Sequence, residues 1–433
     1  MNELYKDFLN LQKTGKVLSL LLLLLSIPYK FFFITFQKCI SGPDAAEYIY
    51  LAGLFKKSGI LGYIQSNDPV SLWRIPTLPF ALYVTQTLFI FYVVQLLFTY
   101  ILAYNFYKII KYITKHQVVS LICFFSILFL PYLNNAACAP LTEFMQVSFI
   151  IYVLRKVLYK HYDWRLFLAL SAFCLLRAEA QYFVFFLIIR ELFLKQYTRI
   201  FLYGIPVCIV LLWCARNKSN FGAFSLVNPV LSSRAMIGSL YGYIYMENRN
   251  EFHAKYDYYN GKDYVNNKKF IEDYQKVVRL ELKHKLLHEP FDYARIRIMQ
   301  IARGFLYFGF NLEQLPDKDW KYKKDATFEE ISANNSEWAY GKILENRDYA
   351  KLCARLLYNG GLAMIHLFGV LFIFLNYRKL LPLLFVLLNF CFILIVEVDM
   401  RYLITIQSIS ACAFIVMCYS IFNFRTLKLN WIQ

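Results

Sequence analysis

The sequence lacks the features that mark metal-binding, disulfide-bonded and secreted proteins. Its ten cysteines form no CxxC pair and no Cys/His spacing typical of zinc. Most of them lie in apolar runs, as Cys123 does, where a thiol behaves as a small hydrophobic side chain. No internal repeat stands out, and the first apolar segment is followed by Tyr29-Lys30-Phe31 instead of a small-residue cleavage site. We therefore expect no disulfide framework, and we predict that the first segment stays in the protein as a helix.

What is present is an excess of apolar residues. Hydrophobic residues make up 59% of the chain and aromatic residues 19%, more than a soluble core of this length needs. Because a membrane span needs about 20 mostly apolar residues, we predict an all-α polytopic membrane protein of about ten transmembrane helices. The predicted spans are 17–37, 78–105, 118–133, 140–158, 165–177, 179–194, 200–215, 357–376, 380–396 and 402–422.

The least regular part of this pattern is the pair 165–177 and 179–194. Each segment is shorter than an ideal span, and only Arg177-Ala178-Glu179 separates them. If they formed one helix, every later segment would reverse its orientation.

Basic residues supply the orientation, because short loops rich in Lys and Arg stay in the cytoplasm. The chain has 47 Lys and Arg against 29 Asp and Glu, a net charge of +18. Basic residues precede the first predicted helix and follow every even-numbered one, whereas the loop 131–139 carries no charge. We expect both termini in the cytoplasm and the excess basic charge at anionic membrane lipids. Nucleic-acid binding is not implied.

Two external loops are long enough to fold. The first, 38–77, contains Pro43 just ahead of a run with helical spacing, which predicts a surface helix starting at Asp44. The second is rich in Tyr, Lys, Asn and Glu and predicts a small, mainly helical external domain. The predicted organisation is an N-terminal transmembrane region of about seven helices (1–215), an external domain (216–356) and a C-terminal transmembrane region of three helices (357–433).

The charges that interrupt the apolar segments share one side of the membrane. In the predicted topology nearly every one of them lies near the non-cytoplasmic end of its helix, and ionisable residues inside membrane segments usually mark functional sites. We therefore predict one polar site on the external face. Its charged residues are Asp44, Glu143, Arg177, Glu179, Glu397, Asp399 and Arg401.

Each of the two leading acids has two interpretations. Asp44 at the start of a surface helix fits a general base that takes a proton from a hydroxyl nucleophile, and it equally fits an N-cap. Glu143 opens the fourth predicted helix, where an acid also complements the helix dipole.

The arginines have two interpretations as well. Arg177 and Arg401 suit bidentate contact with phosphate, but Arg401 could instead pair internally with Glu397 or Asp399. Arg74, just before the second predicted helix, is a third cation candidate or an interfacial anchor. His284 and His288 have the i, i+4 spacing of helical metal sites, yet flanking lysines and the lack of a third ligand argue against a metal there.

Taken in order, these segments resemble multi-pass glycosyltransferases of the GT-C type, the superfamily that uses polyprenyl-phosphate sugars and includes protein O-mannosyltransferases and the lipid A aminoarabinose transferase. The individual motifs are degenerate, and the resemblance lies in their order and common sidedness. They are 43–48 (PDAAEY), 74–76 (RIP), 141–143 (LTE), 176–179 (LRAE), 286–293 (LLHEPFDY) and 401–402 (RY).

The resemblance implies an inverting sugar transfer from a polyprenyl-phosphate donor to a glycan, lipid or protein acceptor. Asp44 would act as base, with Glu143 as a helix-opening acid beside it, and a divalent metal is left open. The donor phosphate would contact Arg177, Arg401 and Arg74. Substrate contacts would come from Glu47, Tyr48, Glu179 and Tyr402.

The chain departs from the protein mannosyltransferases at the position after Asp44, which lacks their adjacent acid. Its Lys-, Asn-, Ile- and Phe-heavy composition is typical of an AT-rich genome. We therefore expect a bacterial inner-membrane enzyme whose site faces the periplasm. The first alternative is a flippase or transporter for lipid-linked saccharides, which would place charges at mid-bilayer and show related halves or broken helices. The others are a polysaccharide polymerase or ligase and a non-catalytic assembly subunit.

Overall fold

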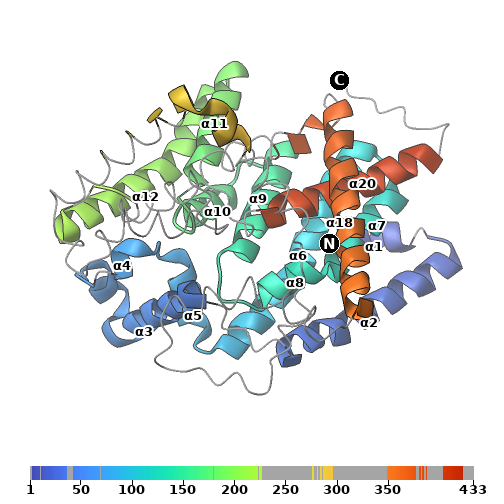
Figure 1. Cartoon of the computed structure of the whole chain (residues 1–433), viewed down its shortest axis with the longest axis horizontal. Helices are drawn as coiled ribbons and strands as arrows, with labels where there is room; N and C mark the ends of the chain where they lie inside the picture. The colour runs from blue at the N-terminus through green and yellow to red at the C-terminus, as the bar shows by residue number, and fades with distance from the viewer. Residues whose placement is uncertain are drawn as a thin grey trace.

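The computed structural model of the chain is entirely helical in its regular elements, within the residues that it describes (Figure 1). These residues are 2–9, 11–36, 42–68, 70–178, 180–222, 224–226, 276, 280, 283–284, 286–295, 349–376, 380–381, 383–384, 387 and 403–422. The helices are α1 (Asn2–Leu9), α2 (Lys13–Phe36), α3 (Gly42–Ile64), α4 (Val70–Trp73), α5 (Thr77–Thr85), α6 (Leu88–Thr114), α7 (Gln117–Phe129), α8 (Pro131–Ala137), α9 (Glu143–Leu158), α10 (Trp164–Cys174), α11 (Ala180–Phe193), α12 (Tyr197–Phe221), α18 (Tyr349–Leu375) and α20 (Leu403–Phe422).

Three of these helices are long and apolar enough to cross a membrane, namely α2, α6 and α12. A fourth span is possible if α7 and α8, which meet at a bend of 52°, count as one. Their apolar side chains remain exposed along much of their length, as at Leu24 and Leu212, which are 58% and 70% exposed. The described residues therefore indicate a membrane protein. The count of about ten spans stays a prediction, and most of the segment 380–396 lies outside the described residues.

The predicted span 78–105 is two helices instead of one. Gln86 adopts a left-handed conformation with φ 62°, and the Thr87 side chain then caps a new helix by accepting from the Ile90 N–H at 3.2 Å. This break separates α5, which packs against α3, from α6, which continues to Thr114.

The segments 165–177 and 179–194 form separate helices, α10 and α11, that reverse direction. Tyr162, just before α10, donates to the Glu191 carboxylate near the end of α11 at 3.4 Å. A continuous helix would place these residues about 40 Å apart at 1.5 Å per residue. Arg199 of α12 also donates to Glu191, at 3.2 Å, so three helix ends meet at one buried carboxylate.

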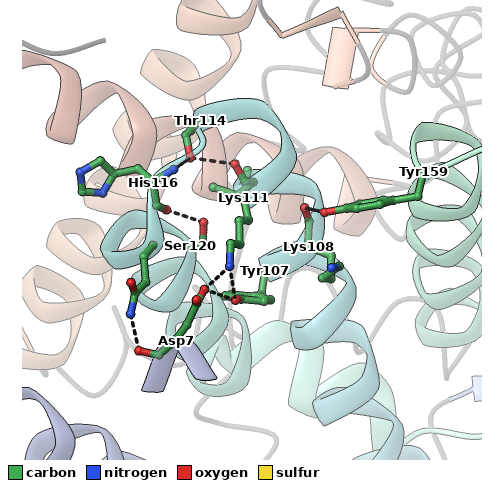
Figure 2. Close-up of polar contacts among 10 residues, drawn as sticks. Asp7, Tyr107, Lys108, Lys111, Thr114, His116, Ser120 and Tyr159 are labelled. Atoms are coloured by element: carbon green, nitrogen blue, oxygen red, sulfur yellow. Dashed lines mark hydrogen bonds and ion pairs between the residues drawn. The ribbon is translucent and has the colours of Figure 1, made fainter. Parts of the chain in front are cut away.

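The Glu191 contacts belong to one end of the bundle, which we call the basic end and which holds further polar contacts. The basic end consists of the C-terminal ends of α6, α9 and α11 and the N-terminal ends of α7, α10 and α12. Figure 2 shows Lys111 and Tyr107 of α6 contacting Asp7 of α1, and Tyr159 contacting the backbone carbonyl of Lys108. Many of the basic residues that the sequence analysis placed in cytoplasmic loops are gathered here. Which side of the membrane this end faces stays a prediction.

Helix α6 occupies the centre of the bundle. It packs against α7 and α9, while α10, α11 and α12 form a group to one side and α2, α18 and α20 lie to the other (Figure 1). The C-terminal part of α20 reaches the basic end, where Tyr419 hydrogen-bonds His116. Helices α18 and α20 pack very closely at Gly369. A Cβ at this position would lie 2.0 Å from the Ser410 carbonyl oxygen, so the packing requires glycine.

The bend between α7 and α8 is stabilised by two neighbouring residues of α2. Tyr29 donates to the Phe129 carbonyl at 3.0 Å, and Lys30 donates to the Asn134 side chain at 2.8 Å and the Leu128 carbonyl at 3.4 Å. The last carbonyls of a helix have no partner within it, and a cation there complements the dipole. Lys30 is 5% exposed, so it acts as a buried cap of α7.

The buried Glu191 carboxylate should control how α10, α11 and α12 pack. Glu191→Gln removes the negative charge between Arg190 and Arg199 and should lower stability by about 2 kcal/mol, because hydrogen bonds to charged groups contribute about that much. The measurement is the midpoint of thermal unfolding of the purified protein in detergent.

Asp163→Asn is the matched control. Asp163 is 40% exposed, whereas Glu191 is fully buried, and asparagine at 163 can still cap α10 and accept a hydrogen bond from Lys156, so the loss should be smaller than for Glu191→Gln. Equal losses in the two variants would contradict a special role for Glu191.

Candidate functional site

The end of the bundle opposite the basic end carries the predicted site, and we refer to it as the site end. It is made by α3, α4, the start of α5, the N-terminal end of α9 and the C-terminal ends of α10 and α12. Four residues that were predicted individually form two ion pairs at this end. A backbone contact joins the segments that carry the two pairs.

The first pair is Glu47 and Arg74. The Arg74 Nε donates to the Glu47 carboxylate at 2.5 Å, and its guanidinium carbon lies 5.3 Å from the centre of the Tyr48 ring. Glu47 and Tyr48 come from α3, whereas Arg74 lies between α4 and α5. The arginine side chain is 17% exposed and the glutamate 24%, so both can meet solvent or a ligand.

The second pair is Glu143 and Arg177. The Arg177 Nη1 lies 3.4 Å from the Glu143 carboxylate and donates to the Thr142 hydroxyl at 2.9 Å. Glu143 is the first residue of α9, where its charge also complements the helix dipole. The Arg177 side chain is 9% exposed and the Glu143 side chain 4%, so this pair is nearly buried.

Thr77 joins the two pairs. Its N–H donates to the Leu175 carbonyl at 3.1 Å and its hydroxyl donates to the Ala172 carbonyl at 2.9 Å. Thr77 follows Arg74 by three residues and Leu175 precedes Arg177 by two. The structure therefore brings both arginine-bearing segments to one place.

Two guanidinium groups at one end of the bundle can serve an anion such as phosphate, because arginine presents paired N–H donors in a fixed plane. Each arginine here also faces a carboxylate, which offsets its charge and fixes its orientation. Glu143 is thus placed to hold Arg177.

Asp44 lies in the first turn of α3, because the helix begins at Gly42 and not at Asp44 as predicted. An acid inside the first turn complements the helix dipole without being the N-cap. The Asp44 side chain is outside the described part of the structure. The other predicted site residues that fall outside it are Glu179, Arg401 and Tyr402, together with Glu397 and Asp399.

Sequence reasoning missed Arg216, which organises the same end. Its guanidinium donates to the Ile64 carbonyl at 2.9 Å, to the Ser66 carbonyl at 3.0 Å and to the Ser71 hydroxyl at 2.9 Å. It also lies 4.9 Å from the Trp213 ring. Arg216 thus fixes the loop after α3 to the end of α12. A basic residue closing an apolar helix was the available signal, but it named no partner.

Asp68 is a second missed residue. It accepts from the Tyr50 hydroxyl at 2.5 Å and from the Val70 N–H at 2.9 Å, so it connects α3 to the start of α4. The hydrogen bond to Asp68 raises the pKa of the Tyr50 hydroxyl. Burial likewise raises the pKa of Tyr63, which keeps its proton at neutral pH.

No group of three or more His, Cys, Asp or Glu side chains forms a metal site among the described residues. His284 and His288 lie with ring centres 5.0 Å apart, and His284 faces Glu289 at 3.4 Å. This contact involves one carboxylate on an exposed helix and makes no cage for a cation.

Comparisons of the chain with known protein families, with curated proteins and with solved structures found no match.

The Glu143–Arg177 pair should be important for stability because it is nearly buried. Arg177→Gln leaves Glu143 as an uncompensated charge and should cost about 3 kcal/mol. Combining it with Glu143→Gln should recover most of this loss. Thermal unfolding of both single variants and the double variant gives the coupling free energy.

Arg74→Gln is the comparison for the more exposed pair and should cost about 1 kcal/mol. If the double variant at Glu143 and Arg177 were no more stable than Arg177→Gln alone, the two side chains would not be coupled.

Proposed function

We propose that the chain is a membrane glycosyltransferase that moves a sugar from a polyprenyl-phosphate donor to an acceptor at the external membrane face. The observation that carries the proposal is the meeting of the α3 segment, the Arg74 segment and the Arg177 segment at one end of the bundle. These segments are three of the motifs on which the GT-C resemblance depends.

The surface helix supports the same function. Helix α3 follows the first candidate span after residues 37–41 and is bent at Gly59, whose φ is 69°. Tyr48, Leu51 and Phe55 are buried against the bundle, so the helix is held in place along one side. A carboxylate in its first turn would be presented at a fixed position at the edge of the bilayer.

In the proposed reaction, Asp44 takes the proton of an acceptor hydroxyl, and the hydroxyl oxygen forms a bond to the anomeric carbon of the sugar. The bond between that carbon and the phosphate oxygen breaks, and the configuration inverts. The polyprenyl phosphate leaves with the electron pair of the broken bond. Arg177, with Arg74 and Arg401, would neutralise the developing charge.

A lipid-linked saccharide transporter is the second candidate, and one observation favours it. Helices α7 and α8 form a broken pair bent by 52°, and Lys30 lies buried beside the break. Broken helices with buried charge are typical of transporter binding sites. Lys30 and Asn134 already satisfy the carbonyls at this break, so a structural role accounts for them and the glycosyltransferase remains the better-supported function.

Transfer by the purified protein tests the proposal. With labelled polyprenyl-phosphate sugar and a membrane extract as acceptor, Asp44→Asn should lower the transfer rate by about 10²- to 10⁴-fold, because the base is lost. Binding of the donor lipid should be retained. Asp163→Asn at the basic end is the matched acid-to-amide control and should keep the wild-type rate.

Equal rates for Asp44→Asn and wild type would exclude Asp44 as the base. Movement of the lipid across reconstituted vesicles without sugar transfer would favour the transporter.

Cysteine labelling tests the sidedness. Leu61 of α3 is 74% exposed, and Lys160 after α9 is also exposed. In a cysteine-depleted background, a membrane-impermeant maleimide should label Leu61→Cys in cells with a permeable outer envelope. It should label Lys160→Cys only after the inner membrane is opened. The reverse pattern would place the proposed site in the cytoplasm.

A further inference from the structure

Two buried glutamines lie in the core of the bundle near the candidate site. Gln95 of α6 is 4% exposed, and Gln146 of α9 is 2% exposed. Neither the oxygen nor the nitrogen of the Gln95 amide has a hydrogen-bond partner in the described structure. Buried amides are normally paired, so an unpaired one this deep calls for a functional explanation.

The two glutamines lie at the same height in the bundle. The Tyr159 hydroxyl donates to the Lys108 carbonyl at 3.0 Å, which fixes the C-terminal end of α9 against α6. Gln95 precedes Lys108 by thirteen residues, and Gln146 precedes Tyr159 by thirteen. At 1.5 Å per residue both lie about 20 Å from this contact. Because α6 and α9 pack against each other and both end there, they place the two amides at one level.

This level adjoins the buried ion pair of the candidate site. Gln146 follows Glu143 by three residues, so the two side chains lie on the same side of α9. Glu143 contacts Arg177. The glutamines therefore lie about one helical turn deeper in the bundle than the ion pair.

The chemistry of a primary amide indicates what it would bind. It offers two N–H donors and a carbonyl acceptor. A phosphate accepts hydrogen bonds but has no proton for the amide oxygen when it is ionised, whereas a hydroxyl both donates and accepts. Several hydroxyls on one sugar ring would satisfy two amides that lie at one level of the bundle.

We propose that Gln95 and Gln146 bind hydroxyl groups of the transferred sugar while Arg177 holds the phosphate of the same donor lipid. This assignment rests on the proposed function and adds the residues that recognise the sugar. Specificity follows, because an amide left unpaired by a wrong sugar disfavours that sugar.

The test compares two sets of probes on the full-length protein in detergent. One probe is polyprenyl phosphate, and the other set is the same lipid carrying a hexose or a pentose. Wild type should bind one sugar-bearing lipid more tightly than the bare lipid. Gln95→Met and Gln146→Met should each lose about tenfold in affinity for that lipid, the effect of one hydrogen bond, and keep their affinity for polyprenyl phosphate.

Asn105→Leu is the matched control. Asn105 is a buried amide on the same helix, ten residues nearer the basic end, and its loss should leave both affinities unchanged. Thermal unfolding without ligand gives a second readout. Gln95→Met should raise the unfolding midpoint, because methionine fills the same space without a buried polar group.

Three outcomes would overturn the assignment. The first is a wild type that binds the bare lipid as tightly as every sugar-bearing lipid, which leaves the proposed transfer activity standing. The second is an equal loss for both kinds of lipid together with a lower unfolding midpoint, which makes the amides structural. The third is a wild type that binds no lipid of the set, which removes the proposed function as well.

Discussion

A polar group inside a bundle surrounded by lipid has only the protein itself as a hydrogen-bonding partner. For its charged groups, the described structure meets this constraint by collecting them at the two ends, whereas the Gln95 amide in between has no partner there. Glu191 joins three helices at the basic end, and Arg177 joins α9 to the end of α10 at the other. Between these levels, α9, α10 and α12 present mainly apolar side chains. The positions of the charges therefore determine how the helices align.

This constraint explains how much could be predicted from the sequence. Apolar length identified most of the described helices, and the grouping of basic residues anticipated which helix ends meet. Common sidedness placed Glu143 and Arg177 at one predicted site, but it did not predict that the two side chains pair with each other. The break at Gln86 was missed because it depends on one left-handed residue and a threonine cap, and the three polar residues 85–87 are a short interruption of a long apolar segment.

Long-range contacts explain the remaining omissions. Arg216 lies about 150 residues from the loop that it binds, and no periodicity relates the two positions. The sequence pattern predicted no contact for Lys30. Its role as a cap requires the bend at Leu130, where the Asn134 side chain accepts from Lys30 and donates to the Leu130 carbonyl. The common level of Gln95 and Gln146 in the bundle follows from the contact between the Tyr159 hydroxyl and the Lys108 carbonyl. This contact joins residues 51 positions apart, so no local pattern predicts it.

The Arg216 contacts connect the end of α12 mechanically to α3 and the loop that follows it. Helix α12 ends at Phe221, five residues after Arg216, and Gly222 closes it with φ 74°. A pull on the chain beyond Gly222 acts on the end of α12. Through the guanidinium it also acts on residues 63–71 and so on α3, whose first turn holds Asp44. The end of α12 and the geometry at Asp44 are thus coupled through two side chains, because Asn220 donates to the same Ile64 and Ser66 carbonyls as Arg216.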